Sequence, residues 1–323
     1  MLNYNNLKFA LMSVVFLFSV SFVTASRTYL AVNHMDTVNG VYTASTGIET
    51  ALYIVLAVSF VLLFVIPFKT KTAERNDLTP VSNVMLRISN IVIGAVMTIS
   101  FLMNMAGLTG FTGSTGSGGS ADADITPFGI AEVVTMALAI IAFFIKGVNA
   151  GTTKKIPAAS AAGAMYIFPC LWSACRLANT FSKYTAVANI PENLFNILSL
   201  AGISLFLLSE GRFMADIGQT SKQGRLWTWS FVGALLMFSS VLPRLIVNIM
   251  VSERAGETIK SAAQFMGRPG ITDFILAVYA ITFALALMMT KSRKPLTDDT
   301  ESSLSASNDS DISLQTGDYI DSN

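Results

Sequence analysis

The chain has 323 residues, of which 52% are hydrophobic and 13% are charged. Soluble domains carry roughly 25% charged residues, so this composition excludes an ordinary water-soluble globular protein. Lys and Arg together number 21 and Asp and Glu number 20, so the formal net charge is +1 and no basic surface for nucleic acid is indicated. One His and two Cys exclude most metal sites and disulfide frameworks.

Eight apolar stretches of the sequence are long enough to cross a lipid bilayer as helices. Such a helix needs about 20 mostly apolar residues, and its backbone groups must hydrogen-bond internally. The stretches occupy residues 8–25, 50–68, 86–109, 127–145, 157–179, 193–209, 227–250 and 270–290. Each is a continuous apolar run, unlike the alternating segments of about ten residues that form membrane β-barrels. The sequence therefore predicts an all-α, polytopic helical membrane domain over residues 1–294 with eight transmembrane helices.

The first stretch has two interpretations. Lys8 precedes an apolar run over residues 9–23, and the small residues that follow suit cleavage by a signal peptidase. Cleavage of residues 1–25 would leave seven spans. Retention as a membrane helix is favoured because the run is long for a signal-peptide core. An even number of spans also returns both termini to the same side of the membrane.

The distribution of Lys and Arg between the short connections predicts the orientation. Cytoplasmic connections of membrane proteins are enriched in these two residues. If the N-terminus is cytoplasmic, the inner connections contain the basic clusters within residues 69–87, 146–155, 212–225 and 291–294. The outer connections have few basic residues, and Arg27 is assigned to the outer segment 27–48. This asymmetry predicts a plasma-membrane protein with both termini in the cytoplasm.

Three polar segments lie outside the predicted spans. Residues 110–126 are rich in Gly and Ser and predict a flexible outer loop. Charges at helical spacing within residues 251–269 predict a short interfacial helix. Residues 295–323 contain acidic residues and no basic ones, which predicts a disordered acidic cytoplasmic tail. The tail is either a solvating segment or a docking segment for a cytoplasmic partner.

The even-numbered stretches resemble one another where they begin. Each has Gly or Pro followed closely by an acidic residue, and these acidic residues are Glu49, Glu132, Glu192 and Asp273. The fifth and seventh stretches share an Arg-Leu pair that begins at Arg176 and at Arg244. The pattern indicates a helix hairpin that is repeated along the chain. The alternative is that acidic residues in a first turn complement the helix dipole wherever helices begin.

Charged residues inside the spans are the candidates for function, because an intramembrane charge is costly unless it is paired or reaches the interface. They are few, and all lie near the outer ends of their helices: Glu132, Arg176, Arg244 and Asp273. The functional interpretation is an outward-facing polar vestibule that binds a polar or charged solute. The structural interpretation is that the Arg side chains extend to the headgroups, or pair with the carboxylates and lock helices together.

Polar amides inside the spans are expected to hydrogen-bond between helices rather than to bind ligands. These amides are Asn90, Asn104, Asn196 and Asn248.

Common catalytic constellations are missing from the sequence. The single histidine, His34, excludes HExxH zinc sites and has no evident nucleophile near it in sequence. Cys170 and Cys175 lie on one predicted helix at a spacing that does not let them face each other. No Walker A, GxGxxG or CxxC string occurs. The expectation is a protein that is not an enzyme and that holds no metal and no cofactor.

Two short features of the chain carry a resemblance to a known group of proteins. One is the outer segment His34-Met35-Asp36 with Asn39-Gly40-Val41-Tyr42, and the other is the helix end Leu207-Leu208-Ser209-Glu210-Gly211-Arg212-Phe213. By layout, over most of its length, the chain looks like the uncharacterised multi-pass membrane proteins common in clostridia-type Gram-positive bacteria. The resemblance implies a bacterial cytoplasmic membrane and no established activity, and it transfers no functional residues.

Two functions fit these observations. The first is a non-catalytic membrane sensor, scaffold or accessory subunit, and the alternative is a small-solute permease. The first is favoured because transporters place polar groups near the bilayer midplane, whereas the ionisable residues here gather at the outer ends of the helices. The expected partner is the lipid bilayer, and a cytoplasmic protein is a further partner if the acidic tail is a docking segment rather than a solvating one.

Overall fold

In a computed structural model, the described part of the chain is helical apart from two very short strands. The structure describes residues 4–36, 42, 47–67, 72–73, 80–108, 127–149, 165–184, 191–214, 221–253, 257–267 and 270–289. The chain divides into two units, residues 1–290 and 291–323, and all described residues belong to the first. The predicted outer loop 110–126 and the acidic tail 295–323 lie outside the described residues.

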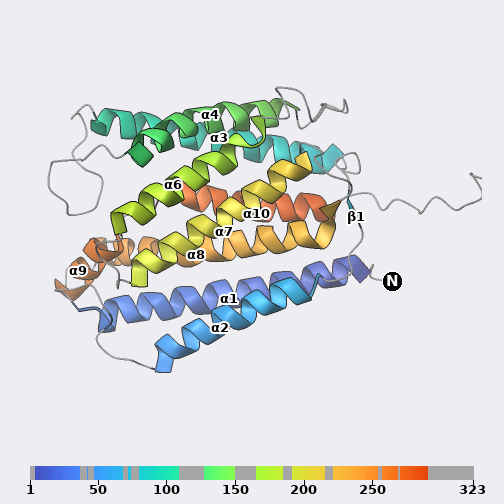
Figure 1. Cartoon of the computed structure of the whole chain (residues 1–323). Coiled ribbons are helices and arrows are strands. Elements are labelled where there is room, and N and C mark those ends of the chain that lie inside the picture. The colour runs from blue at the N-terminus through green and yellow to red at the C-terminus, as the bar shows by residue number, and fades with distance from the viewer. Residues whose placement is uncertain are drawn as a thin grey trace, which may run out of the picture. The chain divides into compact units, whose positions relative to one another are not determined.

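Nine helices are found in the described part of the chain (Figure 1). Their bounds are α1 Tyr4–His34, α2 Gly47–Val65, α3 Pro80–Leu108, α4 Pro127–Asn149, α6 Phe168–Tyr184, α7 Pro191–Met214, α8 Gln223–Glu253, α9 Glu257–Met266 and α10 Ile271–Met288. Strands β1 (Thr72–Ala73) and β2 (Ser221–Lys222) pair in antiparallel fashion. This two-stranded sheet joins the connection after α2 to the connection before α8.

Seven of the described helices are long and apolar enough to cross a membrane, namely α1, α2, α3, α4, α7, α8 and α10. Helix α6 has 17 residues. Large apolar side chains stand out from the bundle, and Val14, Phe18 and Val61 are each at least 60% exposed. Exposed apolar side chains on so many helices suit lipid rather than water. The predicted all-α class is confirmed, and a lipid bilayer is the environment that these helices indicate.

Sequence signals account for where several helices begin. Pro80, Pro127 and Pro191 occupy the first positions of α3, α4 and α7, where the missing N–H costs nothing because no carbonyl precedes it in the helix. An acidic residue in the first turn complements the helix dipole of α2 (Glu49), α7 (Glu192) and α10 (Asp273).

Contacts between helices define two ends of the bundle. The rings of Phe9 on α1 and Trp227 on α8 lie 5.3 Å apart, and Gln223 donates a 2.5 Å hydrogen bond to the carbonyl oxygen of Leu287. The beginnings of α1 and α8 therefore lie beside the final turn of α10. We name this end of the bundle the Lys146 end, after a residue in the last turn of α4. At the opposite end, named the His34 end, the hydroxyl groups of Ser100 on α3 and Thr272 on α10 lie 2.7 Å apart.

Helices α7 and α8 approach most closely at two glycines. A Cβ atom built on Gly202 would lie 2.6 Å from Leu236 Cδ1, and one built on Gly233 would lie 3.2 Å from the carbonyl oxygen of Gly202. Only residues without a side chain allow this backbone-to-backbone packing, which is common where membrane helices associate. The contact makes α7 and α8 one closely packed unit at the centre of the bundle.

The structure corrects the predicted position of Arg27. The first predicted span ended at residue 25 and left Arg27 in an outer connection, but α1 continues to His34 and Arg27 is fully buried within it. The helix extends because a carboxylate from α7 meets the guanidinium, as described below. The predicted short helix within residues 251–269 is confirmed as α9.

The amide predictions have mixed outcomes. Asn90 is hydrogen-bonded to Tyr279 of α10, and Asn248 donates to the carbonyl oxygen of Gly267 just beyond α9. Within the described part of the chain, no hydrogen bond joins the Asn196 side chain to another helix, so the expectation for Asn196 stays a prediction. The side chain of Asn104 lies outside the description.

Candidate functional site

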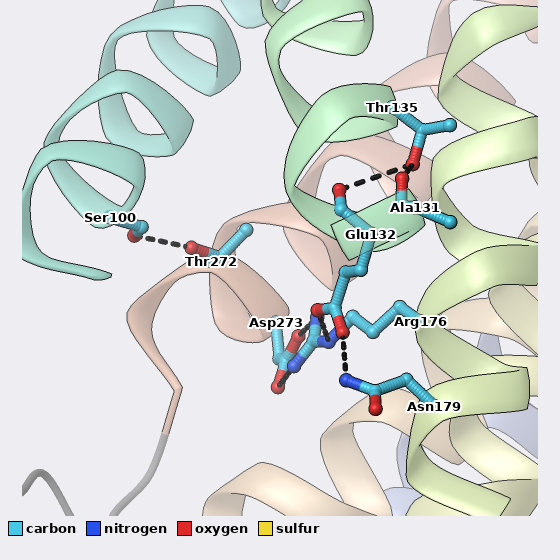
Figure 2. A network of polar contacts seen from close by, with 8 residues as sticks. All are labelled: Ser100, Ala131, Glu132, Thr135, Arg176, Asn179, Thr272 and Asp273. Atoms are coloured by element: carbon cyan, nitrogen blue, oxygen red, sulfur yellow. Dashed lines mark hydrogen bonds and ion pairs between the residues drawn. The ribbon is translucent and has the colours of Figure 1, made fainter. Parts of the chain in front are cut away.

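Three of the four charged residues predicted from the sequence meet at the His34 end (Figure 2). The guanidinium of Arg176 on α6 donates to both carboxylate oxygens of Asp273 on α10, and the Nη2–Oδ2 distance is 2.9 Å. Its Nε atom lies 4.0 Å from Glu132 Oε1 on α4. Asn179, one turn further along α6, donates a 2.6 Å hydrogen bond to Glu132 Oε2. These residues, Glu132, Arg176, Asn179 and Asp273, are named the Arg176 cluster.

The Arg176 cluster is partly open. The side chains of Arg176 and Glu132 are 22% and 23% exposed, whereas that of Asp273 is 8% exposed. With ionised side chains, the cluster has one positive and two negative charges. Asp273 uses both oxygens on the guanidinium, so Glu132 is the carboxylate left in excess, held by an amide and a long ion pair. The cluster therefore presents net negative charge at the His34 end.

Local backbone features fix the carboxylates of this cluster. A Cβ atom on Gly270 would lie 2.6 Å from Asp273 Oδ2, so the residue before α10 has to be small for Asp273 to adopt this position. On α4, the Thr135 hydroxyl donates a 2.6 Å hydrogen bond to the carbonyl oxygen of Ala131. Its hydrogen-bonding capacity is therefore used within the helix, about one turn after Glu132. Figure 2 shows the Ser100–Thr272 pair beside Asp273, where it joins α3 to the beginning of α10.

The fourth predicted residue, Arg244, belongs to a different group of side chains. Its Nε atom lies 3.6 Å from Glu192 Oε2. The other carboxylate oxygen, Oε1, accepts from Nη2 of Arg27 and from the hydroxyl of Tyr42 at 3.4 Å. Arg27, Tyr42, Glu192 and Arg244 are named the Arg27 cluster, which joins α1, α7 and α8. The predicted single vestibule is therefore divided between two clusters.

The Arg27 cluster is closed. Arg27 and Glu192 are 0% and 2% exposed and Arg244 is 12% exposed. The guanidinium of Arg27 stacks 3.9 Å from the centre of the Phe195 ring and donates to the carbonyl oxygen of Ser239. A small apolar cluster of Ala31, Met35, Val247, Ala262 and Met266 packs the contact between α1, α8 and α9. Burial, followed by the Glu192 carboxylate, raises the pKa of Tyr42, so its phenol remains a donor at neutral pH.

A third group of polar side chains lies towards the Lys146 end. Lys146 Nζ on α4 lies 2.6 Å from Glu210 Oε2 on α7, and the two side chains are 1% and 0% exposed. The hydroxyl of Tyr279 on α10 donates to Glu210 Oε1 at 2.9 Å and lies 3.1 Å from Asn90 Oδ1 on α3. Asn90, Lys146, Glu210 and Tyr279 are named the Lys146 cluster. Its charges are equal and opposite, and it joins four helices.

Sequence analysis did not select four charged residues that the structure buries in these clusters. Arg27 was assigned to a connection and Lys146 was counted as a cytoplasmic charge, while Glu192 was treated as a helix-start signal. Glu210 lies close to Arg212 in sequence, which made it look like part of a polar helix end. The available signal was that Lys146 and Glu210, which have opposite charges, both lie near the C-terminal end of an apolar helix.

Comparison with models of protein families, with curated proteins and with solved structures gave no significant match. Among the described residues, no group of three or more His, Cys, Asp or Glu side chains is placed to hold a metal ion. The two cysteines on α6 are free thiols. The fold and the three clusters together define a polytopic α-helical protein with helices apolar enough for a bilayer, in which charged side chains from different helices are brought together.

Proposed function

We propose that this chain is a non-catalytic integral membrane protein that acts as a sensor, scaffold or accessory subunit. The observation that carries the proposal is the pairing of both predicted vestibule carboxylates, Glu132 and Asp273, with the single guanidinium of Arg176. A carboxylate that binds a solute would have to leave its ion pair with Arg176. A carboxylate that joins helices keeps that ion pair, as Glu132 and Asp273 do here.

The clusters support this proposal by the helices that they join. The Arg176 cluster links α4, α6 and α10, and the Arg27 cluster links α1, α7 and α8. The Lys146 cluster links α3, α4, α7 and α10. Removal of one partner from a buried pair costs about 3–5 kcal/mol, because the other charge stays uncompensated. Ion pairs and hydrogen bonds between helices therefore favour one arrangement of the bundle.

The proposal includes eight crossings of the membrane, with α6 as the eighth. Lys146 on α4 and Glu210 on α7 meet at one end, whereas α7 begins at the other end with Glu192 beside Arg27. The chain must therefore cross the bundle between α4 and α7. Helix α6 is about 25 Å long at 1.5 Å per residue, and it carries Arg176 to the His34 end. Both termini are proposed to be cytoplasmic in the plasma membrane, with the Lys146 end inside, as the basic connections predict.

A charge exchange tests the structural role of the Arg176–Asp273 pair. Arg176→Asp and Asp273→Arg are each expected to lower the unfolding temperature of the purified protein, because each places like charges together. The double variant is expected to recover at least half of the loss, because it restores an opposite pair in the same place. The measurement is thermal unfolding in detergent, followed by the fluorescence of the tryptophans. No recovery in the double variant would count against a helix-joining role.

A second candidate function is a small-solute permease, and the partial exposure of Glu132 and Arg176 favours it. The excess negative charge of the Arg176 cluster suits a cation. In proteoliposomes, the wild-type protein is expected to leave the flux of Na⁺, K⁺ and organic ammonium ions at the level of protein-free vesicles. Flux that requires the wild-type protein and is lost in Glu132→Gln, with unfolding temperature unchanged, would replace the first proposal with the second.

A further inference from the structure

The Arg27 cluster has more positive charge than the described residues neutralise. Two guanidiniums, Arg27 and Arg244, share the single carboxylate of Glu192. Among the residues that the structure describes, neither guanidinium has a second acidic partner. Arg27 is fully buried and Arg244 is 12% exposed, so water screens this surplus charge poorly. A buried, uncompensated charge is among the most costly features that a fold can carry.

Three of the buried side-chain atoms that lack a hydrogen-bond partner among the described residues belong to this cluster. Within the described part of the chain, Arg27 Nε is buried without a hydrogen-bond acceptor, while Arg244 Nε and Glu192 Oε2 form an ion pair at 3.6 Å but no hydrogen bond. The hydroxyl groups of Thr24 and Thr28, within one helical turn of Arg27 on α1, are also buried and unpaired.

These two threonines behave unlike other hydroxyl-bearing residues of the apolar helices. Ser19, Thr98 and Thr135 each return the hydroxyl to the carbonyl oxygen four residues earlier, at 2.6–2.7 Å. Thr24 and Thr28 do not make that bond. Their hydroxyl groups are therefore buried donors without an acceptor on the same part of α1 as Arg27.

The cluster lies near one edge of the hydrocarbon core. Helices α1 and α8 have 31 residues each, so each is about 46 Å long, whereas the hydrocarbon core of a bilayer is about 30 Å thick. If the core is centred on these helices, the Cα atoms of Arg27 and Arg244 both lie within about 6 Å of its edge. Arg244, which is 12% exposed, is the side chain that can extend from this depth towards the interface, where lipid phosphates and dissolved anions are present.

We propose that the Arg27 cluster is a binding site for one singly charged oxyanion, which Arg244 contacts directly and which balances the surplus charge. Arg is suited to phosphate and carboxylate groups because its planar guanidinium donates two parallel hydrogen bonds. The phosphate can belong to a lipid headgroup or be free in solution as its singly charged form, since both present phosphate oxygens as acceptors. The inference goes beyond the proposed function and does not depend on it.

The test uses the full-length protein, freed of lipid in a phosphate-free maltoside detergent. Inorganic phosphate and phosphatidylglycerol are titrated in separate arms, and the unfolding temperature is measured. At a hundredfold excess over Kd, a ligand that binds only the folded state is expected to raise the unfolding temperature of the wild-type protein by about 5 °C. A rise with inorganic phosphate alone assigns a free oxyanion, and a rise with phosphatidylglycerol alone assigns a lipid headgroup.

Three variants distinguish anion binding from a structural role of Arg244. In Arg244→Gln, the rise is expected to disappear. Because this change also removes the surplus charge, the unfolding temperature without anion is expected to equal or exceed that of wild type. Arg212→Gln, at an exposed position of α7 near the Lys146 end, is the matched control and is expected to respond as wild type. Arg244→Lys keeps the charge without the planar fork, and is expected to need about tenfold more ligand for the same rise.

Two results would overturn the proposal. One is a wild-type protein whose unfolding temperature responds to neither phosphate nor phosphatidylglycerol. The other is a response that Arg244→Gln and Arg244→Lys both retain in full. If Arg244→Gln does not fold, Arg244→Lys and the wild-type titration still decide between the outcomes.

Discussion

The Arg176 cluster and the Arg27 cluster both lie at the His34 end and both combine guanidinium and carboxylate groups. They differ in solvent exposure and in the balance of charge. The Arg176 cluster has two carboxylates for one guanidinium and is about one-fifth exposed at Arg176 and Glu132. The Arg27 cluster has two guanidiniums for one carboxylate and is almost completely buried. The difference arises from their surroundings, because α9 packs against α1 and α8 near the Arg27 cluster. Composition alone therefore does not decide whether a membrane ion pair is accessible.

Removing one carboxylate from each cluster should give the largest contrast. Glu192→Gln leaves two guanidiniums without a counter-charge, one of them fully buried, and is expected to lower the free energy of unfolding by about 3–5 kcal/mol. Glu132→Gln leaves the Arg176–Asp273 pair intact and removes the excess charge, so its effect is expected to stay within about 1 kcal/mol. Urea unfolding in detergent measures both. Equal losses in the free energy of unfolding would show that the two clusters do not differ in how strongly their carboxylates stabilise the fold.

Salt should affect the open cluster more than the closed one. Asp273→Asn weakens the pair with a partly exposed guanidinium, and an expected loss of about 1–2 kcal/mol at low salt should shrink in 1 M NaCl. The loss in Glu192→Gln should persist, because salt screens an ion pair weakly when both side chains, here Arg27 and Glu192, are 2% exposed or less. Unfolding curves at 0.05 and 1 M NaCl compare the variants. A salt-sensitive Glu192→Gln would contradict the closed description.

The smallest expected effect is a pH dependence that belongs to Tyr42. Burial raises its pKa, so above a pH of about 10 the unfolded chain loses the phenolic proton while the folded chain retains it. Stability is therefore complete below that pH and falls as the pH rises beyond it. Tyr42→Phe is expected to cost about 1 kcal/mol or less at pH 8, and to lose stability less steeply than wild type between pH 10 and 11. If the stability of the wild-type protein and of Tyr42→Phe fell equally with pH between pH 10 and 11, the result would argue against a raised pKa for Tyr42.

The sequence predicted the parts of the fold that depend on long apolar runs. Seven candidate spans and the short helix α9 appear where hydrophobicity and charge spacing indicated them. The end of α1 was wrong because Arg27 looks like a residue in water when its partner on α7 is unknown. Burial of a charge depends on a contact 165 residues away, and single-sequence periodicity carries no information about such contacts.

The candidate site was predicted in part for the same reason. Glu132, Arg176 and Asp273 were selected because each is a charge inside an apolar run, and they meet in space. Arg244 was selected by the same rule and lies in the other cluster, since depth along a helix does not specify which neighbour it faces. Lys146 and Glu210 escaped selection because they lie at the ends of apolar runs, where charges usually meet water.

The ring contacts at the beginning of α1 bear on how the chain can be processed. Phe9 packs on Trp227 and Phe231, and Phe16 packs on Phe231, so these rings of α8 are covered by α1. Proteolytic removal of residues 1–25 would uncover them and would detach Arg27 from the helix that positions it. A matured chain of that kind would need another hydrophobic segment against α8, or would have to repack its centre around the vacated space.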